Sequence, residues 1–203
     1  MNPRERIRTH YEDRIDPRRE GWDVLDWASA RTQKRRFEIL LENVDLHGRS
    51  ILDVGCGVGE LLGFLQDKGV AAEYTGVDIL EKMVEEARRR HPGGRFLCAD
   101  IFESPCPLEQ TYDVVYCSGT LNLNVGNNDA FLPRALRRFV EVTRQLVVVN
   151  FLHIREAVDT PLYYFYDPRT VLEIAGKLPV EARLIDDYLP NDFTVVLTRE
   201  SAG

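Results

Sequence analysis

The sequence predicts an α/β protein with a doubly wound, mostly parallel sheet of seven strands, helices on both faces and an antiparallel hairpin at the carboxyl end. Short apolar runs, which are typical of buried parallel strands, alternate with helical segments along most of the chain. The last two runs are joined by a short connection that contains Pro190-Asn191-Asp192. A parallel crossover needs about a dozen residues or more, so these two strands are expected to pair antiparallel.

The first half of the chain is predicted to contain a long helical region followed by alternating strands and helices. Apolar residues recur at spacings near three and four from about residue 20 to residue 47, and Gly48 ends this pattern. Strands are expected at residues 50–54, 74–78 and 95–100. Helices are expected from Glu60 to Gly69 and from Glu81 to Arg90, where His91-Pro92-Gly93-Gly94 ends the second one.

The second half continues the alternation and then closes with the hairpin. Strands are expected at residues 112–117, 145–151, 182–188 and 193–199. A helix is expected from about Asp129 to Val142. Another is predicted to begin at Asp167-Pro168, because a capping carboxylate followed by proline favours a helix start, and to end near Lys177.

Composition and charge limit the classes of function. A formal net charge of −7 disfavours binding to a phosphate backbone, which requires clustered cations. The basic runs Lys34-Arg35-Arg36 and Arg134 to Arg144 are interleaved with acids, as on solvated helix faces. The amino terminus lacks an apolar signal core, and no apolar run approaches the roughly 20 residues of a membrane span. We therefore expect a cytoplasmic protein for which nucleic acid is a disfavoured partner.

The cysteines predict no metal site. Cys56, Cys98, Cys106 and Cys117 form no CxxC pair and no Cys/His cluster with zinc-ligand spacing. Reduced thiols are expected at all of these positions, which suits a reducing compartment.

The most informative segment is the glycine-rich turn after the first expected strand. Gly55, Gly57 and Gly59 lie where a strand passes into a helix, which is where open α/β sheets bind ligands. A dinucleotide fingerprint would read GxGxxG, but here the third glycine comes one residue early and Glu60 stands in its place. A carboxylate at a helix start repels a pyrophosphate. The turn therefore predicts a nucleoside-like ligand without phosphate.

Acidic residues end three of the predicted parallel strands. Asp53, Asp78 and Asp100 are expected to converge on one cleft, because the carboxyl ends of parallel strands open on the same edge. Asp78 follows Asp53 at about the interval at which an acid meets ribose hydroxyls in dinucleotide folds. A carboxylate accepts two hydroxyl hydrogen bonds, which suits a vicinal diol. A single aspartate of this kind would be a turn or capping residue, but three behind a glycine turn indicate a site.

These motifs together resemble a known enzyme family. The segment Leu52–Gly59 looks like the first signature of the class I S-adenosylmethionine-dependent methyltransferases. Gly76-Val77-Asp78-Ile79 resembles their second element, Ala99-Asp100-Ile101 their third and Tyr112–Cys117 the strand that follows. The resemblance covers residues 49–151 well, and it implies a Rossmann-like fold, S-adenosyl-L-methionine as cofactor, S-adenosyl-L-homocysteine as product and methyl transfer as activity. It implies a methyltransferase core over residues 49–203 and a helical cap over residues 1–48, within one domain overall.

The resemblance also implies roles for individual residues. Asp53, Gly55, Cys56 and Gly57 would line the methionine portion of the cofactor. Asp78 would hold the ribose and Ile79 the adenine face, while Asp100 and the backbone at Ile101 would meet the adenine edge. Cys117 and Ser118 would lie near the sulfonium. For Ile79 and Ile101, ordinary core packing is the alternative. In the cap, Tyr11 is expected as a lid residue and Arg36 as a cation for the methionine carboxylate, unless they are a surface tyrosine and a solvated arginine.

The methyl acceptor is less defined by the sequence. His153 and Tyr164 follow the fifth expected strand and are candidate general bases. The run Tyr163–Tyr166 would form an aromatic wall for the acceptor or pack the next helix. Ser118–Asn122 lacks the Asn/Asp-Pro-Pro-Tyr/Phe motif of adenine and glutamine methyltransferases, and Pro105-Cys106 follows the wrong strand for a cytosine nucleophile. A small-molecule methyltransferase is expected, with a binding or regulatory protein of the same fold, lacking transferase activity, as the alternative.

Overall fold

The computed structural model describes residues 3–200, which form two compact units that divide between Asp100 and Ile101. Each unit contains part of the predicted alternation of strands and helices. Among the described residues, no helix is long and apolar enough to cross a membrane.

The first unit contains three parallel strands in the order β3-β2-β1. Their bounds are Ser50–Val54 for β1, Glu73–Asp78 for β2 and Arg95–Cys98 for β3. The connecting helices are α4 (Glu60–Asp67) and α5 (Glu81–Arg90). The strands and helices predicted for residues 50–100 are therefore confirmed to within a few residues. All of β1 is buried, as expected for a parallel strand covered on both faces.

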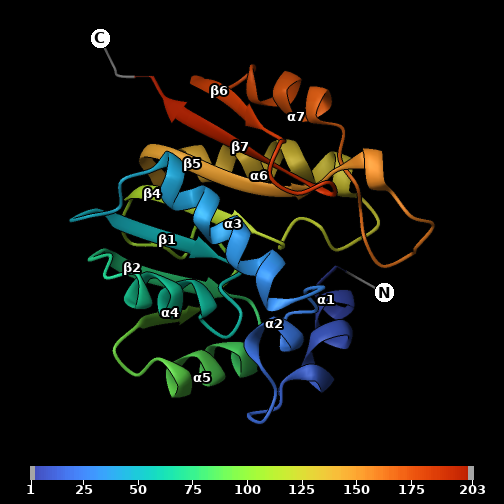
Figure 1. Ribbon diagram of the computed structural model, residues 1–203. Coiled ribbons are helices and arrows are strands. Elements are labelled where there is room, and N and C mark those ends of the chain that lie inside the picture. The colour runs from blue at the N-terminus through green and yellow to red at the C-terminus, as the bar shows by residue number, and fades with distance from the viewer. Residues whose placement is uncertain (1–2, 201–203) are drawn as a thin grey trace. The chain divides into compact units, whose positions relative to one another are not determined.

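Helices precede the first strand, as predicted, but they are shorter than the pattern suggested. They are α1 (Pro3–Tyr11), the 3-10 turn η1 (Glu12–Arg14), α2 (Gly21–Val24) and α3 (Ala30–Asn43). The single helical region expected over residues 20–47 is wrong in its continuity. Asp26 has a φ of 60°, outside the helical range, and Ser29 begins a new helix by accepting a hydrogen bond from Thr32 N–H. Figure 1 shows α1 and α2 beyond the carboxyl ends of β1 and β2.

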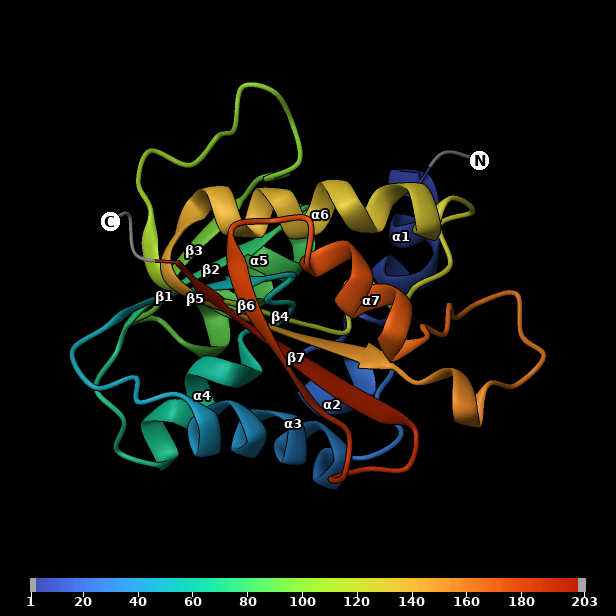
Figure 2. The ribbon, with the colours of Figure 1, turned by 90° about the horizontal axis from the view of Figure 1, so that it is seen from above.

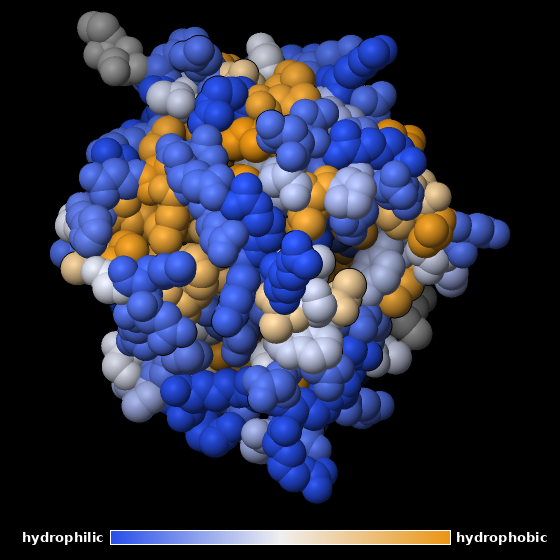
Figure 3. Space-filling view, in the orientation of Figure 1, coloured by the Kyte–Doolittle hydropathy of each residue, from blue (hydrophilic) through white to orange (hydrophobic). Residues whose placement is uncertain are grey.

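Helix α3 has one buried and one solvated side. Phe37, Ile39 and Leu40 are buried, whereas the side that faces the viewer in Figure 3 is hydrophilic. On the polar side Arg35 forms ion pairs with Glu38 at 3.2 Å and with Glu42 at 2.5 Å. The solvated interpretation of the basic run is confirmed for this arginine, but Arg36 is buried.

The second unit contains the remaining strands in the order β4-β5-β7-β6. Strand β4 spans Tyr112–Ser118 and β5 spans Thr143–Leu152, while β6 spans Val180–Ile185 and β7 spans Asp192–Arg199. Strands β4 and β5 are parallel, whereas β7 pairs antiparallel with both β5 and β6. The predicted carboxyl-terminal hairpin is therefore confirmed, and the seven predicted strands are all present.

The helices of the second unit also follow the sequence. Helix α6 spans Asn128–Val142, the 3-10 turn η2 spans Ile154–Glu156 and α7 spans Pro168–Ala175. Asp167 caps α7 by accepting a hydrogen bond from Arg169 N–H at 2.9 Å, with Pro168 at the first helical position, as predicted. Figure 2 shows α6 running along the strands of this unit.

Candidate functional site

The glycine turn between β1 and α4 has the conformation that its sequence requires. Gly55, Gly57 and Gly59 have φ values of 73°, 52° and 86°, a region that favours glycine. The N–H groups of Gly55 and Cys56 donate to the carbonyl of Val77 at 2.8 and 3.1 Å. The turn is therefore fixed against the end of β2.

Cys56 is part of the support of this turn. Its side chain is buried, and a Cβ added at Gly76 would lie 2.8 Å from its Sγ atom. Burial raises the pKa of the thiol well above its usual range, so Cys56 is a neutral packing residue.

Asp78, at the end of β2, is tied directly to the glycine turn. One carboxylate oxygen accepts a hydrogen bond from Gly57 N–H and the other from Leu80 N–H, both at 3.0 Å. Burial raises the pKa of Asp78, and these backbone donors oppose that rise. Because a carboxylate has about four acceptor positions, Asp78 can still accept a hydrogen bond from a diol.

Asp53 has a partner that the sequence analysis missed. Its carboxylate is 5% exposed and accepts a hydrogen bond from the Tyr74 hydroxyl at 2.7 Å. Burial raises the pKa of Asp53 to about 7, the Tyr74 hydroxyl opposes this rise, and nearby Asp78 adds to it. The two aspartates are thus close enough to interact. An aromatic residue at the start of β2 gives no polar signal in sequence, because tyrosine is common in strands.

The segment before the first strand covers the glycine turn. A Cβ added at Gly57 would lie 2.3 Å from Cδ2 of Leu25, so the leucine packs directly on the turn. Val24, Val58, Leu80 and Met83 form a buried apolar cluster at this place. The partly buried residues packed against it are Ile7, Tyr11, Ile15, Leu25 and Ile79. The predicted lid residue Tyr11 and the predicted adenine contact Ile79 therefore belong to one cluster.

The remaining predicted residues of the first unit, Asp100 and Arg36, also have defined partners. Arg4, in α1, lies with Nη2 3.0 Å and Nε 3.3 Å from Asp100 Oδ2. The Arg36 guanidinium lies 4.2 Å from the centroid of the Trp27 ring, and its Nη1 donates to Thr32 O at 2.8 Å. Arg36 is 4% exposed, so the alternative of a solvated arginine is wrong.

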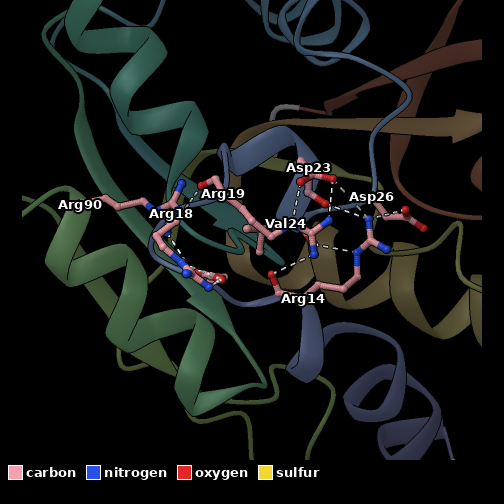
Figure 4. Close-up of polar contacts among 8 residues, drawn as sticks. Arg14, Arg18, Arg19, Asp23, Val24, Asp26 and Arg90 are labelled. Carbon is pink, nitrogen blue, oxygen red and sulfur yellow. Dashed lines mark hydrogen bonds and ion pairs between the residues drawn. The ribbon is translucent and has the colours of Figure 1, made fainter.

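A polar network fixes the fold of the amino-terminal segment (Figure 4). Arg14 donates to the carbonyls of Asp23 and Val24 and forms an ion pair of 2.6 Å with Asp26. Arg19 holds the Asp23 carboxylate with two hydrogen bonds of 2.6 Å. These contacts stabilise the left-handed Asp26 and hence place Leu25, the neighbouring residue, over Gly57.

The same segment is joined to the α4 and α5 helices. Arg90 donates to Arg19 O at 2.9 Å (Figure 4) and also pairs with Glu86 at 2.6 Å. Glu60 is the residue that stands in place of the third glycine of a dinucleotide fingerprint. Its Oε1 lies 3.7 Å from Arg90 Nη1, and its side chain packs on Gly21.

In the second unit, the predicted residues are Ile101 at its start, Cys117 and Ser118 at the carboxyl end of β4, and His153 and Tyr164 after β5. Cys117 and Ile101 are buried, and Ser118 is half-buried. Ser118 Oγ lies 3.4 Å from Asn150 Oδ1, a long hydrogen bond in which the hydroxyl donates.

His153 is held in one tautomer. Its Nδ1 accepts a hydrogen bond from Arg155 N–H at 3.0 Å and thereby caps η2, so the neutral ring carries its proton on Nε2. Burial lowers the pKa of His153, and Arg155 lowers it further. To take a proton from an acceptor, the ring would have to give up this cap.

Tyr164 donates its hydroxyl to Asp129 at 2.5 Å, and burial together with this partner raises its pKa to about 12. Tyr166, in the same aromatic run, donates to Leu121 O at 2.8 Å and packs edge-on against Phe151. The structure thus supports the packing interpretation for Tyr166.

Among the described residues, no group of three or more His, Cys, Asp or Glu side chains is placed to hold a metal ion. All of the cysteines are free thiols.

Comparison with known proteins identifies methyltransferases as similar to this chain. Residues 51–145 match the family described as "Methyltransferase domain". A malonyl-[acyl-carrier protein] O-methyltransferase from Acetivibrio thermocellus is 41% identical over 158 residues, which are 75% of this chain and 53% of that protein. A trans-aconitate 2-methyltransferase from Delftia acidovorans is 33% identical over 119 residues, 55% of this chain and 44% of that protein. The chain spans about half the length of these curated relatives.

A solved structure confirms the fold along the chain. The magnesium protoporphyrin IX methyltransferase from Synechocystis, crystallised with bound S-adenosylmethionine, superposes with a TM-score of 0.71 at 18% identity over 98% of both chains. The molecule is therefore a Rossmann-like α/β protein, as predicted. More particularly, it has the fold of the class I S-adenosylmethionine-dependent methyltransferases, with a methyltransferase domain over residues 51–145.

Proposed function

We propose that this protein binds S-adenosylmethionine and transfers its methyl group to a small-molecule acceptor. The observation that best supports this proposal is the hydrogen bonding of Asp78 at the glycine turn. Its two carboxylate oxygens accept hydrogen bonds from the N–H groups of Gly57 and Leu80. This arrangement places a glycine turn beside a carboxylate suited to a diol. The buried Asp53 beside it gives the turn a second acid, which fits a ligand that carries a cationic amino group and no phosphate.

The proposed roles are those that the family resemblance implies for each residue. Asp53, Gly55, Cys56 and Gly57 line the methionine portion, and Asp78 binds the ribose hydroxyls. Ile79, Asp100 and Ile101 surround the adenine, and Cys117 with Ser118 lies near the sulfonium. The bound cofactor supplies an electrophilic methyl group on sulfur, which passes in line to an acceptor lone pair as the C–S bond breaks. The protein contributes orientation and exclusion of water.

Residues 1–48 act as a cap in this proposal. Leu25 packs on Gly57, Tyr11 on the cluster that contains Ile79, and Arg4 pairs with Asp100. All of these partners are proposed cofactor contacts, so the cap must shift to admit the adenine and then close over it. Arg36, buried beside Trp27, remains the proposed cation for the methionine carboxylate.

The acceptor is proposed to be a carboxylic acid. The two curated relatives act, by name, on a malonyl group and on trans-aconitate, both of which present carboxylates. A carboxylate is already a nucleophile at neutral pH and needs no general base. This fits the second unit, in which His153 Nδ1 and the Tyr164 hydroxyl are both engaged in hydrogen bonds. Paired arginines such as Arg35 and Arg144 support a small molecule rather than nucleic acid as partner. The free thiols suit the reducing cytoplasm.

Two measurements test the proposal. Calorimetric titration with S-adenosylmethionine is expected to show saturable binding, whereas NAD, as control, shows none. Transfer of a labelled methyl group is then assayed with monomethyl malonate, trans-aconitate and a matched amide of each. Label on the acids but not on the amides supports the carboxylate acceptor. Cofactor binding without transfer to any compound of a metabolite extract would favour the alternative, a binding protein of this fold. No binding at millimolar cofactor would refute the proposal.

A further inference from the structure

A buried polar group of the amino-terminal segment lacks a hydrogen-bond partner. Trp27 lies in the loop between α2 and α3, and its indole Nε1 is buried without a partner among residues 3–200. Gln33 and Arg36, three residues apart on one face of α3, are only 3% and 4% exposed. A buried, unpaired N–H group is unfavourable, so the donor at Trp27 indicates that a ligand or a water molecule supplies its acceptor.

The surroundings of the Trp27 N–H group favour an anion over water. The Arg36 guanidinium lies 4.2 Å from the centroid of the Trp27 ring, and its Nη1 donates to Thr32 O at 2.8 Å, so the cation is held beside the indole. Indole and guanidinium groups donate hydrogen bonds but accept none. A carboxylate accepts at two oxygens and carries the opposite charge, so it fits this pair of groups better than a neutral water molecule does.

The segment that carries Trp27 also covers the glycine turn. Leu25, two residues before Trp27, packs on Gly57. Phe37 of α3 packs against Phe64 of α4, with 5.4 Å between the ring centroids. The loop and α3 are therefore anchored on the turn and on the helix that follows it, within the first unit.

The cofactor of the proposed function contains one group that suits this place. S-adenosylmethionine carries a single negatively charged group, the carboxylate of its methionine portion. Asp53 and Asp78, at the ends of β1 and β2, are acceptors, so they suit the amino group and the ribose hydroxyls but not a second carboxylate. The cation and the N–H group that a carboxylate requires are those of Arg36 and Trp27.

We propose that the Trp27 Nε1–H group donates a hydrogen bond to the methionine carboxylate beside Arg36, so that this pair selects ligands that carry the carboxylate. This inference rests on the proposed function and adds Trp27 to the residues that contact the cofactor. The Trp27 ring also supports Arg36 through a cation–π contact. One side chain thus both positions the cation and binds the anion.

The test compares, by calorimetry, S-adenosylmethionine with decarboxylated S-adenosylmethionine, which lacks only the carboxylate. The wild type is expected to bind the form with the carboxylate more tightly. Trp27→Phe keeps an aromatic ring for Arg36 but removes the N–H group. It should lower the affinity for S-adenosylmethionine about tenfold, as for a lost hydrogen bond to a charged group, and change the affinity for the decarboxylated form less than about twofold.

Trp22→Phe is the matched control, because Trp22 and Trp27 are the two tryptophans of the chain. This variant should leave the ratio of the two affinities unchanged. It also leaves Trp27 as the single tryptophan, whose fluorescence emission should shift more with S-adenosylmethionine than with the decarboxylated form. If Trp27→Phe does not fold, this second measurement decides.

The contradicting results are distinct. A parallel loss of both affinities in Trp27→Phe would assign the indole a packing role, and no loss would mean that its N–H group binds only water. Either result overturns the inference, as do equal emission shifts for the two ligands or equal affinities of the wild type for them. Failure of the wild type to bind either ligand refutes the proposed function instead.

Discussion

Asp53 and Tyr74 form a buried pair in which one hydroxyl stabilises the charge of one carboxylate. The pKa of Asp53 is raised from 3.8 to about 7, so the folded chain holds this proton more tightly than the unfolded chain. The stability that the neutral carboxyl contributes is present at low pH and is lost as the pH rises from about 4 to about 7. The Tyr74 hydroxyl reduces this loss, because its hydrogen bond is stronger to the ionised form.

Tyr74→Phe is therefore expected to destabilise the protein in a pH-dependent manner. The cost in free energy of unfolding should be about 1 kcal/mol at pH 5, where Asp53 is mostly neutral, and about 2 kcal/mol at pH 8.5, where it is ionised. Urea denaturation at both pH values measures the difference. In an Asp53→Asn background the cost of Tyr74→Phe should no longer depend on pH. A constant cost in both backgrounds would mean that Asp53 does not titrate in this range.

Asp78 is expected to dominate cofactor affinity. Asp78→Ala removes the acceptor for the ribose hydroxyls and leaves the N–H groups of Gly57 and Leu80 without a partner. Binding of S-adenosylmethionine should weaken by about 1–3 kcal/mol, as measured by calorimetry. Asp45→Ala, at an exposed loop position, serves as control. Unchanged affinity in Asp78→Ala would refute the ribose assignment.

Single residues of the site were predictable where their chemistry is visible in sequence. Asp78 follows from its place at a strand end behind a glycine turn. Tyr74 and Leu25 do not, because their roles depend on packing: tyrosine and leucine are ordinary core residues until the fold places them against Asp53 and Gly57. The base candidates His153 and Tyr164 show the opposite problem. Their residue types suit proton transfer. In the structure, however, both are engaged in hydrogen bonds, and nothing in the sequence indicates these bonds.

Helix α2 is short, and it is fixed by a close contact with α4. A Cβ added at Gly21 would lie 1.9 Å from Glu60 Oε1 and 2.6 Å from Cγ. Glu60 is partly buried against Arg90, and burial raises its pKa. A side chain at position 21 would therefore force Glu60, including its Cγ, to leave its position beside Arg90.

Gly21→Ala is accordingly expected to loosen α2 and to cost about 1–3 kcal/mol of stability, the usual range for overpacking. Glu60→Ala should relieve the clash, so that the double variant is more stable than the sum of the single changes predicts. Thermal unfolding of the four proteins of this cycle provides the coupling energy. Additive effects would show that the contact does not determine the position of α2.

Elements with a clear period were predictable, and irregular segments were not. Strand β1 and helix α5 match their predicted bounds, because an apolar run and a polar helix ended by His91-Pro92-Gly93 leave few alternatives. The break between α2 and α3 was missed. The apolar spacing continues through it, whereas the left-handed Asp26 depends on its ion pair with the distant Arg14.

For the whole molecule, the fold class could be predicted because its evidence is spread along the chain: seven apolar runs, the helices between them and a short final connection. The acceptor could not be predicted, since substrate contacts in such folds are made by residues without a fixed pattern. The cofactor could be predicted in part. The three glycines of the turn are visible in the sequence, and they allow the positive φ values that the turn requires.

Ligand binding should stabilise the folded chain as a whole. With S-adenosylmethionine at a hundredfold excess over its Kd, the expected gain is about 2.7 kcal/mol, which corresponds to a rise in Tm of about 5–10 °C for a chain of this size. Scanning fluorimetry measures the shift, and NAD at equal concentration should give none. Equal shifts for both ligands would indicate non-specific stabilisation.

The contacts of Leu25 with Gly57 and of Arg4 with Asp100 have a consequence for how occupancy can be observed. Since thermodynamic coupling is reciprocal, a ligand that gives the first helix new surface to pack on must lower the equilibrium population in which that helix is open. The peptide hydrogens of residues 4–11 should then exchange with deuterium more slowly in the loaded protein. These few backbone positions would report a filled cleft before any methyl acceptor has been found.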